Sequence, residues 1–383
     1  MKIFITGAQG FIGRNLLAWL AHMPEAQAVG FDRDNTPAEL EAGLATADCV
    51  IHLAGVNRPE TVDEFRTGNV DLTARIGDVL AANGRAVPIL FASSTQAELD
   101  NPYGVSKRQA EAALAEYARR SGARVVVYRL TNVFGKWCRP NYNSVVATFC
   151  HNVAHDLPIT ISDPQKEVAF VHVDDVIRAF WEEIEKEKSS AASRGTEVET
   201  QRLGEVVYRD AGPVYPVSLG RLAELLQAFR QSRQTLVVPD FSDAFSHKLY
   251  GTFLSYLAPD DFAYDLTQRV DPRGSLAEFV KSPPFGQIFV SRTAPGITRG
   301  NHFHHLKTEK FLVLEGQAII RFRHIHSAEV IEYPVDGAMY RVVDIPPGYT
   351  HSIENVGAGT LVTLFWASEI FDPQRPDTVW EAV

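Results

Sequence analysis

Two side chains that could exchange a proton with a carbonyl oxygen stand four positions apart, at Tyr103 and Lys107 in the segment YGVSK. Helical residues with this spacing project from one face, so the phenol and the ammonium group would lie together. A neighbouring ammonium stabilises a phenolate, and we therefore expect it to lower the pKa of Tyr103. Ser94, which ends a strand-like run, precedes the pair. In isolation, such a Tyr and Lys pair more often belongs to a plain surface helix than to a catalytic site. Its position after Ser94 and a glycine-rich turn favours catalysis here.

That glycine-rich turn, GAQGFIG, directly follows the first strand-like run and precedes a helix expected to begin near Arg14. Glycines let the backbone turn tightly beside a pyrophosphate, and the helix N-terminus offers free N–H groups to the phosphates. The next strand ends in Asp32-Arg33. An acid at this place binds the ribose hydroxyls of NAD, whereas an arginine binds the extra phosphate of NADP, so the pair is compatible with either cofactor. The turn at Leu53-Ala54-Gly55 either passes beside the cofactor or is a packing turn without a role in binding. The residues expected to bind the cofactor are Gly7, Gly10, Phe11, Ile12, Gly13, Asp32, Arg33, Leu53, Ala54, Gly55, Tyr103 and Lys107.

A second group of reactive side chains lies near the C-terminus, at His302, His304, Glu309 and His351. In a strand, residues two apart face the same side, so His302 and His304 would point together. Imidazole and carboxylate groups are natural ligands of a divalent transition metal, and zinc is the first choice. A solvated patch of histidines is the alternative, which the distant third imidazole after a Pro/Gly turn makes less favourable.

The elements that must position these groups differ between the two ends of the chain. From Met1 to about Asp175, short apolar runs alternate with helix-length amphipathic stretches, which predicts βαβ units and a doubly wound parallel sheet. After about Phe262, short strand-like runs separated by Gly, Pro and Asn predict an all-β sandwich or barrel. The stretch Glu182–Arg194 predicts a helix end followed by an exposed loop. We place the domain boundary between residues 245 and 246, giving domains 1–245 and 246–383.

Composition excludes several classes of partner. A formal net charge of -10 argues against nucleic acid, because phosphate neutralisation needs clustered Lys and Arg. The three cysteines show no paired spacing, which favours a reducing compartment. No apolar run approaches the roughly 20 residues that span a bilayer, and no signal segment follows Met1. We therefore expect a cytoplasmic protein that contacts no membrane.

The N-terminal motifs together resemble those of the extended short-chain dehydrogenase/reductases. The resemblance rests on TGAQGFIG, HLAG, the SS that precedes YGVSK, RLTNVFG and FVHVDD. It implies a Rossmann-type fold in which Ser94, Tyr103 and Lys107 are catalytic and Asn132 lies near a sugar nucleotide. The interval from Ser94 to Tyr103 is shorter than in most members of that family.

The C-terminal motifs resemble two families. The spacing from Gly296 to Gly316 and from Pro346 to Asn355 is similar to both consensus halves of the cupin superfamily, which implies a jelly-roll barrel with His302, His304, Glu309 and His351 as metal ligands. The segments DPRGSLAEF and RGNHF resemble the deoxysugar 3,5-epimerases, which implies a substrate-binding Arg273. In those metal-free enzymes the histidine matching His302 is a base, so its role stays open between ligand and proton acceptor.

The whole chain resembles the bifunctional capsular-polysaccharide and O-antigen enzymes of the UDP-N-acetyl-L-fucosamine route. GVNRPE, NPYGVSK, FGKW with RPNYNSVVATFC, and RGNHFHH carry this likeness. It implies a homodimer in which the cupin epimerises C3 of UDP-2-acetamido-2,6-dideoxy-4-hexulose, a UDP-linked 4-keto-deoxy amino sugar. The resemblance further implies that the N-terminal domain then reduces C4 with NADPH to the L-talose sugar. The use of NADPH favours Arg33 as the residue that binds the extra phosphate of the cofactor.

Two other functions compete with this one. The first is a binding or regulatory protein that has lost catalysis, against which the intact Ser94, Tyr103 and Lys107 set counts. The second is an NAD-dependent nucleotide-sugar epimerase that recycles its cofactor and carries a non-catalytic, ligand-sensing cupin. Stoichiometric NADPH oxidation by a UDP-4-keto-sugar distinguishes both from a reductase.

Overall fold

The computed structural model describes residues 1–193 and 204–383 of the chain. The backbone divides into two compact units, of which the first comprises Met1–Leu226 with Lys248–Leu257 and the second Gln227–His247 with Ala258–Val383. The domain boundary between residues 245 and 246 stays a prediction, because compactness alone does not define an independently folding segment. None of the helices in the described ranges is long and apolar enough to cross a membrane.

The first unit is built on a parallel sheet of six strands in the order β2-β1-β3-β4-β5-β8. Its strands are β1 (Lys2–Thr6), β2 (Gln27–Phe31), β3 (Cys49–His52), β4 (Ile89–Ser94), β5 (Val125–Leu130) and β8 (Val206–Arg209). The strand order reverses between β1 and β3, so the carboxyl ends of these two strands flank a crevice of the kind in which doubly wound sheets bind ligands. The predicted doubly wound parallel sheet is confirmed.

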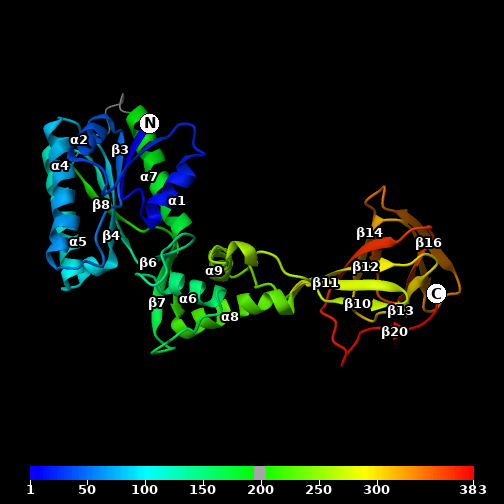
Figure 1. The fold of residues 1–383 in the computed structure, drawn as a ribbon. Coiled ribbons are helices and arrows are strands. Elements are labelled where there is room, and N and C mark those ends of the chain that lie inside the picture. Colours follow the sequence, from blue (N-terminus) through cyan, green and yellow to red (C-terminus); the bar gives the residue numbers. More distant parts are fainter. Residues whose placement is uncertain (194–203) are drawn as a thin grey trace. The chain divides into compact units, whose positions relative to one another are not determined.

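Helices cover both faces of this sheet (Figure 1). They are α1 (Phe11–Leu20), α2 (Pro37–Thr46), α3 (Asp63–Phe65), the π-helix Arg66–Asp71, α4 (Leu72–Ala82), the short 3-10 helix Thr95–Glu98, α5 (Pro102–Ser121) and α7 (Val173–Ser193). Strand β1 shows how the two cores form, since Ile3 and Ile5 pack with α1 and α7 whereas Phe4 packs with α2, α4 and α5. Alternating side chains of one strand therefore stabilise both layers.

A second, smaller sheet is formed by strands that follow β5. A three-stranded sheet contains β6 (Asn132–Phe134), β7 (Glu167–His172) and β9 (Tyr215–Ser218) in that order. The helices of this part of the chain are α6 (Val145–Ala154), α8 (Leu219–Thr235), α9 (Ala244–Leu254) and the 3-10 turn Pro259–Asp261. Ser144 caps α6 by accepting a hydrogen bond from the Ala147 N–H, which fixes the start of that helix.

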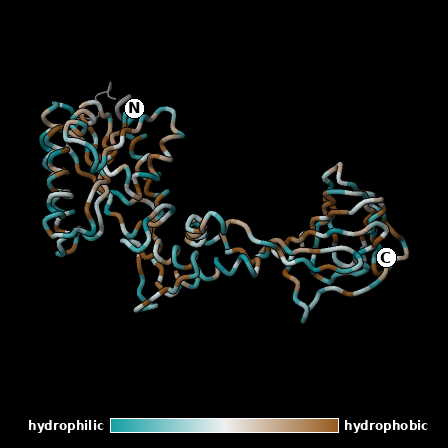
Figure 2. The backbone as a smooth tube through the Cα atoms, in the orientation of Figure 1, coloured by the Kyte–Doolittle hydropathy of each residue, from teal (hydrophilic) through white to brown (hydrophobic). Residues whose placement is uncertain are grey.

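The second unit carries two antiparallel sheets, as the β-rich texture predicted. One sheet has the order β10 (Gln268–Asp271), β11 (Gly274–Ser282), β12 (Gly286–Thr293), β19 (Leu361–Ala367), β14 (Glu309–Glu315) and β17 (Val342–Ile345). The other has the order β16 (Val330–Asp336), β15 (Gln317–His324), β18 (Tyr349–Asn355), β13 (Thr298–Phe303) and β20 (Val379–Trp380). Side chains from both sheets form one core, which includes Phe311, Ile320, Ile353 and Phe365. In each unit the hydrophobic stretches follow the strands (Figure 2).

Two local expectations need correction. Helix α1 begins at Phe11 and not near Arg14, because the glycine turn leads directly into its first turn. Helix α7 continues through Ser193 instead of ending in a loop, as alanine is the best helix former. Arg194, the last residue of that expected loop, lies outside the described residues.

Candidate functional site

The glycine turn closes on itself at the carboxyl end of β1. Gly7 adopts a φ of +71°, and its N–H donates to Phe31 O at 2.8 Å. A Cβ built on Gly13 would lie 2.3 Å from Gly7 O and 2.6 Å from Ala8 O, so only glycine lets α1 pack this close to the turn. Gly10, Phe11 and Gly13 thus form a tight entry to the helix. Free backbone N–H groups at such an entry can bind phosphate.

The acid and the arginine after β2 have different surroundings. The Asp32 carboxylate accepts the Gln9 N–H at 2.6 Å through Oδ2 and the Arg33 N–H at 3.1 Å through Oδ1. Asp32 therefore ties the end of β2 to the glycine turn. Arg33 is exposed, and among the described residues no carboxylate lies within ion-pair distance of it. Its guanidinium group can bind a phosphate at this corner of the sheet.

The turn after β3 lies against both the glycine turn and Lys107. A Cβ on Gly7 would be 2.7 Å from Ala54 N, which shows how closely the two turns approach. A Cβ on Gly55 would be 3.2 Å from Lys107 Nζ. The turn Leu53-Ala54-Gly55 thus connects the glycine turn to the ammonium group, although packing alone would also place it there.

Ser94, Tyr103 and Lys107 lie together at the end of β4 and the start of α5. Lys107 is buried and donates from Nζ to Ala92 O at 3.0 Å. Burial lowers the pKa of Lys107 to about 8, although the Glu111 carboxylate opposes the change. Burial raises the pKa of Tyr103, and a hydrogen bond with Ser94 opposes this rise. The expected lowering of the Tyr103 pKa is wrong for this structure, because desolvation of the phenolate is the larger effect.

A buried relay that the sequence did not reveal supports the turn after β3. The Ala54 N–H donates to Thr6 Oγ1 at 3.3 Å, and Thr6 Oγ1 lies 2.6 Å from His52 Nδ1. His52 Nε2 lies 2.8 Å from Thr73 Oγ1, whose hydroxyl donates to Asn69 O at 2.5 Å. Because Thr73 gives its only proton to Asn69, His52 must donate from Nε2 and accept from Thr6 at Nδ1. Burial, the main cause, and Lys107 lower the pKa of His52 to about 3, so the ring is neutral.

Asn69 is the second residue that the sequence motifs did not reveal. It lies in the π-helix, buried, and its side chain accepts the Val56 N–H at 2.7 Å and donates to Val56 O at 3.0 Å and Ser106 Oγ at 2.9 Å. These bonds hold the turn after β3 against α5, where Lys107 lies. A π-helix within a helix often marks a functional site, but no residue pattern in the sequence predicts one.

Two residues expected to bind substrate have hydrogen-bond or ion-pair partners outside the reactive groups. Asn132 belongs to β6, outside the main sheet, and its amide donates to Ala169 O at 3.1 Å. Arg273 lies in the turn between β10 and β11, where it is exposed and pairs with Asp271 at 2.5 Å. No hydrogen bond or ion pair of the described residues joins either side chain to the reactive groups.

In the second unit, the four predicted ligands converge between the two sheets. His302 and His351 are register partners on β13 and β18, His304 follows β13, and Glu309 begins β14 of the opposite sheet. The candidate ligand atoms of these residues all lie within 4.8 Å of one another. His304 and His351 are fully buried, and each places Nε2 3.4 Å from Glu309 Oε2. A left-handed Asn301 in a bulge of β13 aims His302 into the same space.

The hydrogen bonds of the two buried rings show which nitrogen faces the cluster. His304 Nδ1 lies 2.5 Å from Asp377 O, and His351 Nδ1 lies 3.4 Å from Tyr349 O, so each ring donates from Nδ1 to a carbonyl. Each Nε2 lies 3.4 Å from Glu309 Oε2, and neither has a hydrogen-bond partner among the described residues. Burial raises the pKa of Glu309, but the neighbouring His304 and His351 rings outweigh this effect and lower that pKa. A cation bound between these two nitrogens and the carboxylate would satisfy all three groups.

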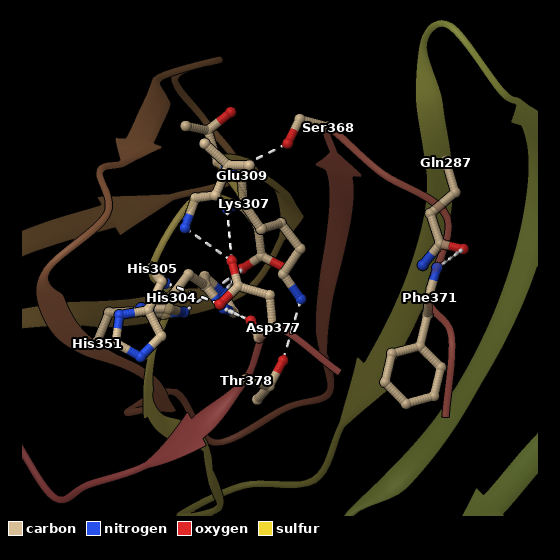
Figure 3. Close-up of polar contacts among 12 residues, drawn as sticks. Gln287, His304, His305, Lys307, Glu309, His351, Ser368, Phe371, Asp377 and Thr378 are labelled. Carbon is tan, nitrogen blue, oxygen red and sulfur yellow. Dashed lines mark hydrogen bonds and ion pairs between the residues drawn. The ribbon is translucent and has the colours of Figure 1, made fainter. Parts of the chain in front are cut away.

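Asp377 holds the loop that carries His304 and was not predicted. Its carboxylate accepts the backbone N–H groups of His305, Leu306 and Lys307 at 2.8 to 2.9 Å, as Figure 3 shows. Burial opposes ionisation, but these three hydrogen bonds prevail and lower the pKa of Asp377 to about 2. His302 is also uncharged near neutrality, because burial and the neighbouring imidazoles lower its pKa to about 4.

A parallel sheet with a glycine turn at its reversal of strand order, and a Ser, Tyr and Lys set beside that turn, is the arrangement of Rossmann-type proteins that bind a dinucleotide cofactor. Comparison with known proteins makes this specific. The chain belongs to the NAD dependent epimerase/dehydratase family, whose model matches residues 3–195, and to its CapF-like members, with a polysaccharide biosynthesis C-terminal domain matching residues 269–379. It is therefore an oxidoreductase of nucleotide-sugar and polysaccharide biosynthesis.

Individual relatives agree with this assignment. A UDP-2-acetamido-2,6-beta-L-arabino-hexul-4-ose reductase of Pseudomonas aeruginosa is 43% identical over 378 residues, covering 99% of this chain and 98% of the relative. The GDP-6-deoxy-D-mannose reductase of the same species is 26% identical over 238 residues, covering 54% of this chain and 78% of the relative. The crystal structure of the capsular polysaccharide assembling protein CapF from Staphylococcus aureus matches with a TM-score of 0.89 and 45% identity, covering 100% of both chains.

Proposed function

We propose that this chain is bifunctional. The C-terminal unit, a cupin, epimerises C3 of UDP-2-acetamido-2,6-dideoxy-4-hexulose, and the N-terminal unit then reduces C4 with NADPH to the UDP-linked L-talose sugar. The product serves capsule or O-antigen synthesis. The similarity to a UDP-sugar 4-ketoreductase over 99% of the chain supports the substrate class. The main structural support is that the chain holds two separate reactive clusters, each built from the residue types that its step requires.

In the reductase unit, NADPH supplies the hydride that reaches C4. The glycine turn and the start of α1 are proposed to hold its pyrophosphate, and the exposed Arg33 its additional phosphate. Tyr103 donates its phenolic proton to the carbonyl oxygen, with Ser94 as a second hydrogen-bond donor to that oxygen. The raised pKa of Tyr103 keeps the phenol protonated before transfer. Lys107 is charged below a pH of about 8 and stabilises the phenolate that transfer leaves behind.

In the cupin unit, His304, Glu309 and His351 are proposed to hold zinc or another divalent metal, with His302 as the fourth ligand or as the base at C3. The metal would polarise the ketone, which makes the neighbouring C–H groups more acidic. The two buried Nε2 atoms without partners support a metal, because unsatisfied buried polar groups are costly. The Asp377 and Tyr349 carbonyls orient the two rings as outer hydrogen-bond acceptors. We further propose a cytoplasmic homodimer that binds no nucleic acid and no membrane.

A matched pair of variants tests this division of labour. Tyr103→Phe removes the proton donor, so NADPH oxidation with the UDP-4-keto-sugar should fall at least about 100-fold. Deuterium from solvent should still enter C3 in this variant, as mass spectrometry of the sugar would show. His351→Ala should give the converse: loss of metal by elemental analysis, loss of C3 exchange, and unchanged NADPH binding.

The outcomes separate the alternatives. Loss of both activities in Tyr103→Phe contradicts the assignment of one step to each unit. Unchanged metal content in His351→Ala contradicts the ligand set. Absence of stoichiometric NADPH oxidation in the unmodified chain would instead favour an epimerase that recycles NAD.

A further inference from the structure

Two arginines from distant loops of the first unit lie against the same tyrosine ring. Arg58 follows β3, and its guanidinium carbon lies 5.6 Å from the centroid of the Tyr142 ring. Arg139 belongs to the loop between β6 and α6, and its guanidinium carbon lies 5.4 Å from the same centroid. We call these three residues the arginine clamp. All three are exposed.

The two arginines of the clamp differ in their ion pairing from several other exposed arginines of the first unit. In the part of the chain that the structure describes, no carboxylate lies within ion-pair distance of Arg58 or Arg139, whereas exposed arginines such as Arg75 and Arg120 pair with Glu41 and Asp78. Two guanidinium groups held beside one ring repel each other, and an exposed cation–π contact offsets only a small part of this repulsion. This occurs in a chain with a net charge of -10, where carboxylates are plentiful. The two guanidinium groups are therefore available to bind an anion.

The clamp is held near the proposed reductase site. Arg58 follows Gly55 by three residues, which span at most about 11 Å, and Gly55 is adjacent to the Lys107 ammonium group. On the other side, Arg14 donates to Trp137 O at 2.8 Å and Asn15 to Lys136 O at 3.1 Å. These bonds attach the loop of Arg139 to α1, the helix that follows the glycine turn.

We propose that Arg58 and Arg139 bind the diphosphate of the nucleotide-sugar substrate of the reductase, an inference that rests on the proposed function. Guanidinium groups form paired hydrogen bonds with phosphate oxygens, and two of them match the two phosphates of a nucleoside diphosphate. The Tyr142 ring contacts both guanidinium groups and so keeps them near each other. The cofactor phosphates have a different location, at the glycine turn and Arg33. The clamp therefore sets the affinity for the sugar nucleotide and leaves cofactor binding to other residues.

The test uses the full chain with Arg58→Ala, Arg139→Ala and the double variant. Loss of one charge-assisted contact should raise the KM for the UDP-4-keto-sugar and the inhibition constant of UDP in the NADPH oxidation assay about 10- to 100-fold. The kcat, the Kd of NADPH and deuterium exchange at C3 should not change. Arg120→Ala removes one exposed charge elsewhere in the unit and should alter none of these quantities, which controls for net charge.

Three results would overturn the inference. An unchanged KM and UDP inhibition constant in the double variant would mean that the clamp binds no diphosphate. A weaker NADPH Kd with an unchanged sugar KM would assign the arginines to the cofactor. Calorimetry with UDP alone tests the clamp even if the unmodified chain oxidises no NADPH. In that case, weaker UDP binding by the double variant supports the clamp although the proposed reduction fails. Identical UDP titrations of the unmodified chain and the double variant reject the clamp.

Discussion

At the scale of single residues, the buried Lys107 ammonium loses its proton much closer to neutrality than an ordinary lysine does. Burial brings its pKa down to about 8, whereas Tyr103 is shifted upwards and stays protonated over the same range. The folded chain therefore loses the Lys107 proton at a pH where an unfolded chain still retains it. The folding free energy consequently becomes more favourable as pH rises above about 8, while the charge available to the cofactor disappears.

This opposition gives a pH prediction for cofactor binding. If the ammonium group is required, the Kd of NADPH should be constant below a pH of about 8 and rise about tenfold for each pH unit above it. Fluorescence titration with NADPH between neutral and alkaline pH measures this directly. Lys107→Met should bind weakly with little pH dependence, since it never carries the charge. A flat profile for the unmodified chain across this range contradicts a role for the Lys107 charge.

At the scale of elements, the contact between the glycine turn and α1 leaves no room for a side chain at Gly13. Gly13→Ala would place a methyl group 2.3 Å from Gly7 O, which requires a backbone shift that costs about 1–3 kcal/mol. Alanine is otherwise the better helix former, so the loss can be assigned to the clash. We expect lower stability to denaturant and a raised Kd of NADPH.

Gly251 provides the matched control for this substitution. It also lies in a helix, α9, and a Cβ there would have nothing within 4 Å. Gly251→Ala should therefore stabilise the chain by up to about 1 kcal/mol without changing NADPH binding. Equal effects of both substitutions on the Kd would contradict a specific role for the glycine turn.

The elements also show what the sequence could and could not predict. Regular spacing predicted the parallel sheet and the helix that carries Tyr103 and Lys107, because local periodicity fixes which face a side chain occupies. The grouping of His302 with the distant His351 followed instead from the likeness to the cupin consensus. The Asn69 bonds and the Asp377 loop contacts escaped prediction because they join segments far apart in the chain. The direction of the Tyr103 pKa was missed because burial depends on the whole surrounding structure.

At the scale of the whole molecule, each proposed step draws on residues from one unit alone. Ser94, Tyr103, Lys107 and the arginine clamp belong to the first unit, and the histidine and glutamate cluster belongs to the second. Within residues 1–193 and 204–383, no element contributes a reactive side chain to both clusters. Damage to one cluster should consequently leave the chemistry of the other intact, even within one polypeptide.

This independence predicts complementation between two inactive chains. Tyr103→Phe retains the histidine and glutamate cluster, and His351→Ala retains Ser94, Tyr103 and Lys107. If the proposed function holds, a mixture should convert the UDP-4-keto-sugar to the reduced product while neither variant alone does so. The epimerised ketone must then diffuse between molecules, and the rate should rise with the concentration of each variant. Chromatography of the products with NADPH consumption measures it. If the mixture makes no product while the unmodified chain turns over, the intermediate cannot leave the chain that forms it, and the two clusters must act as one assembly.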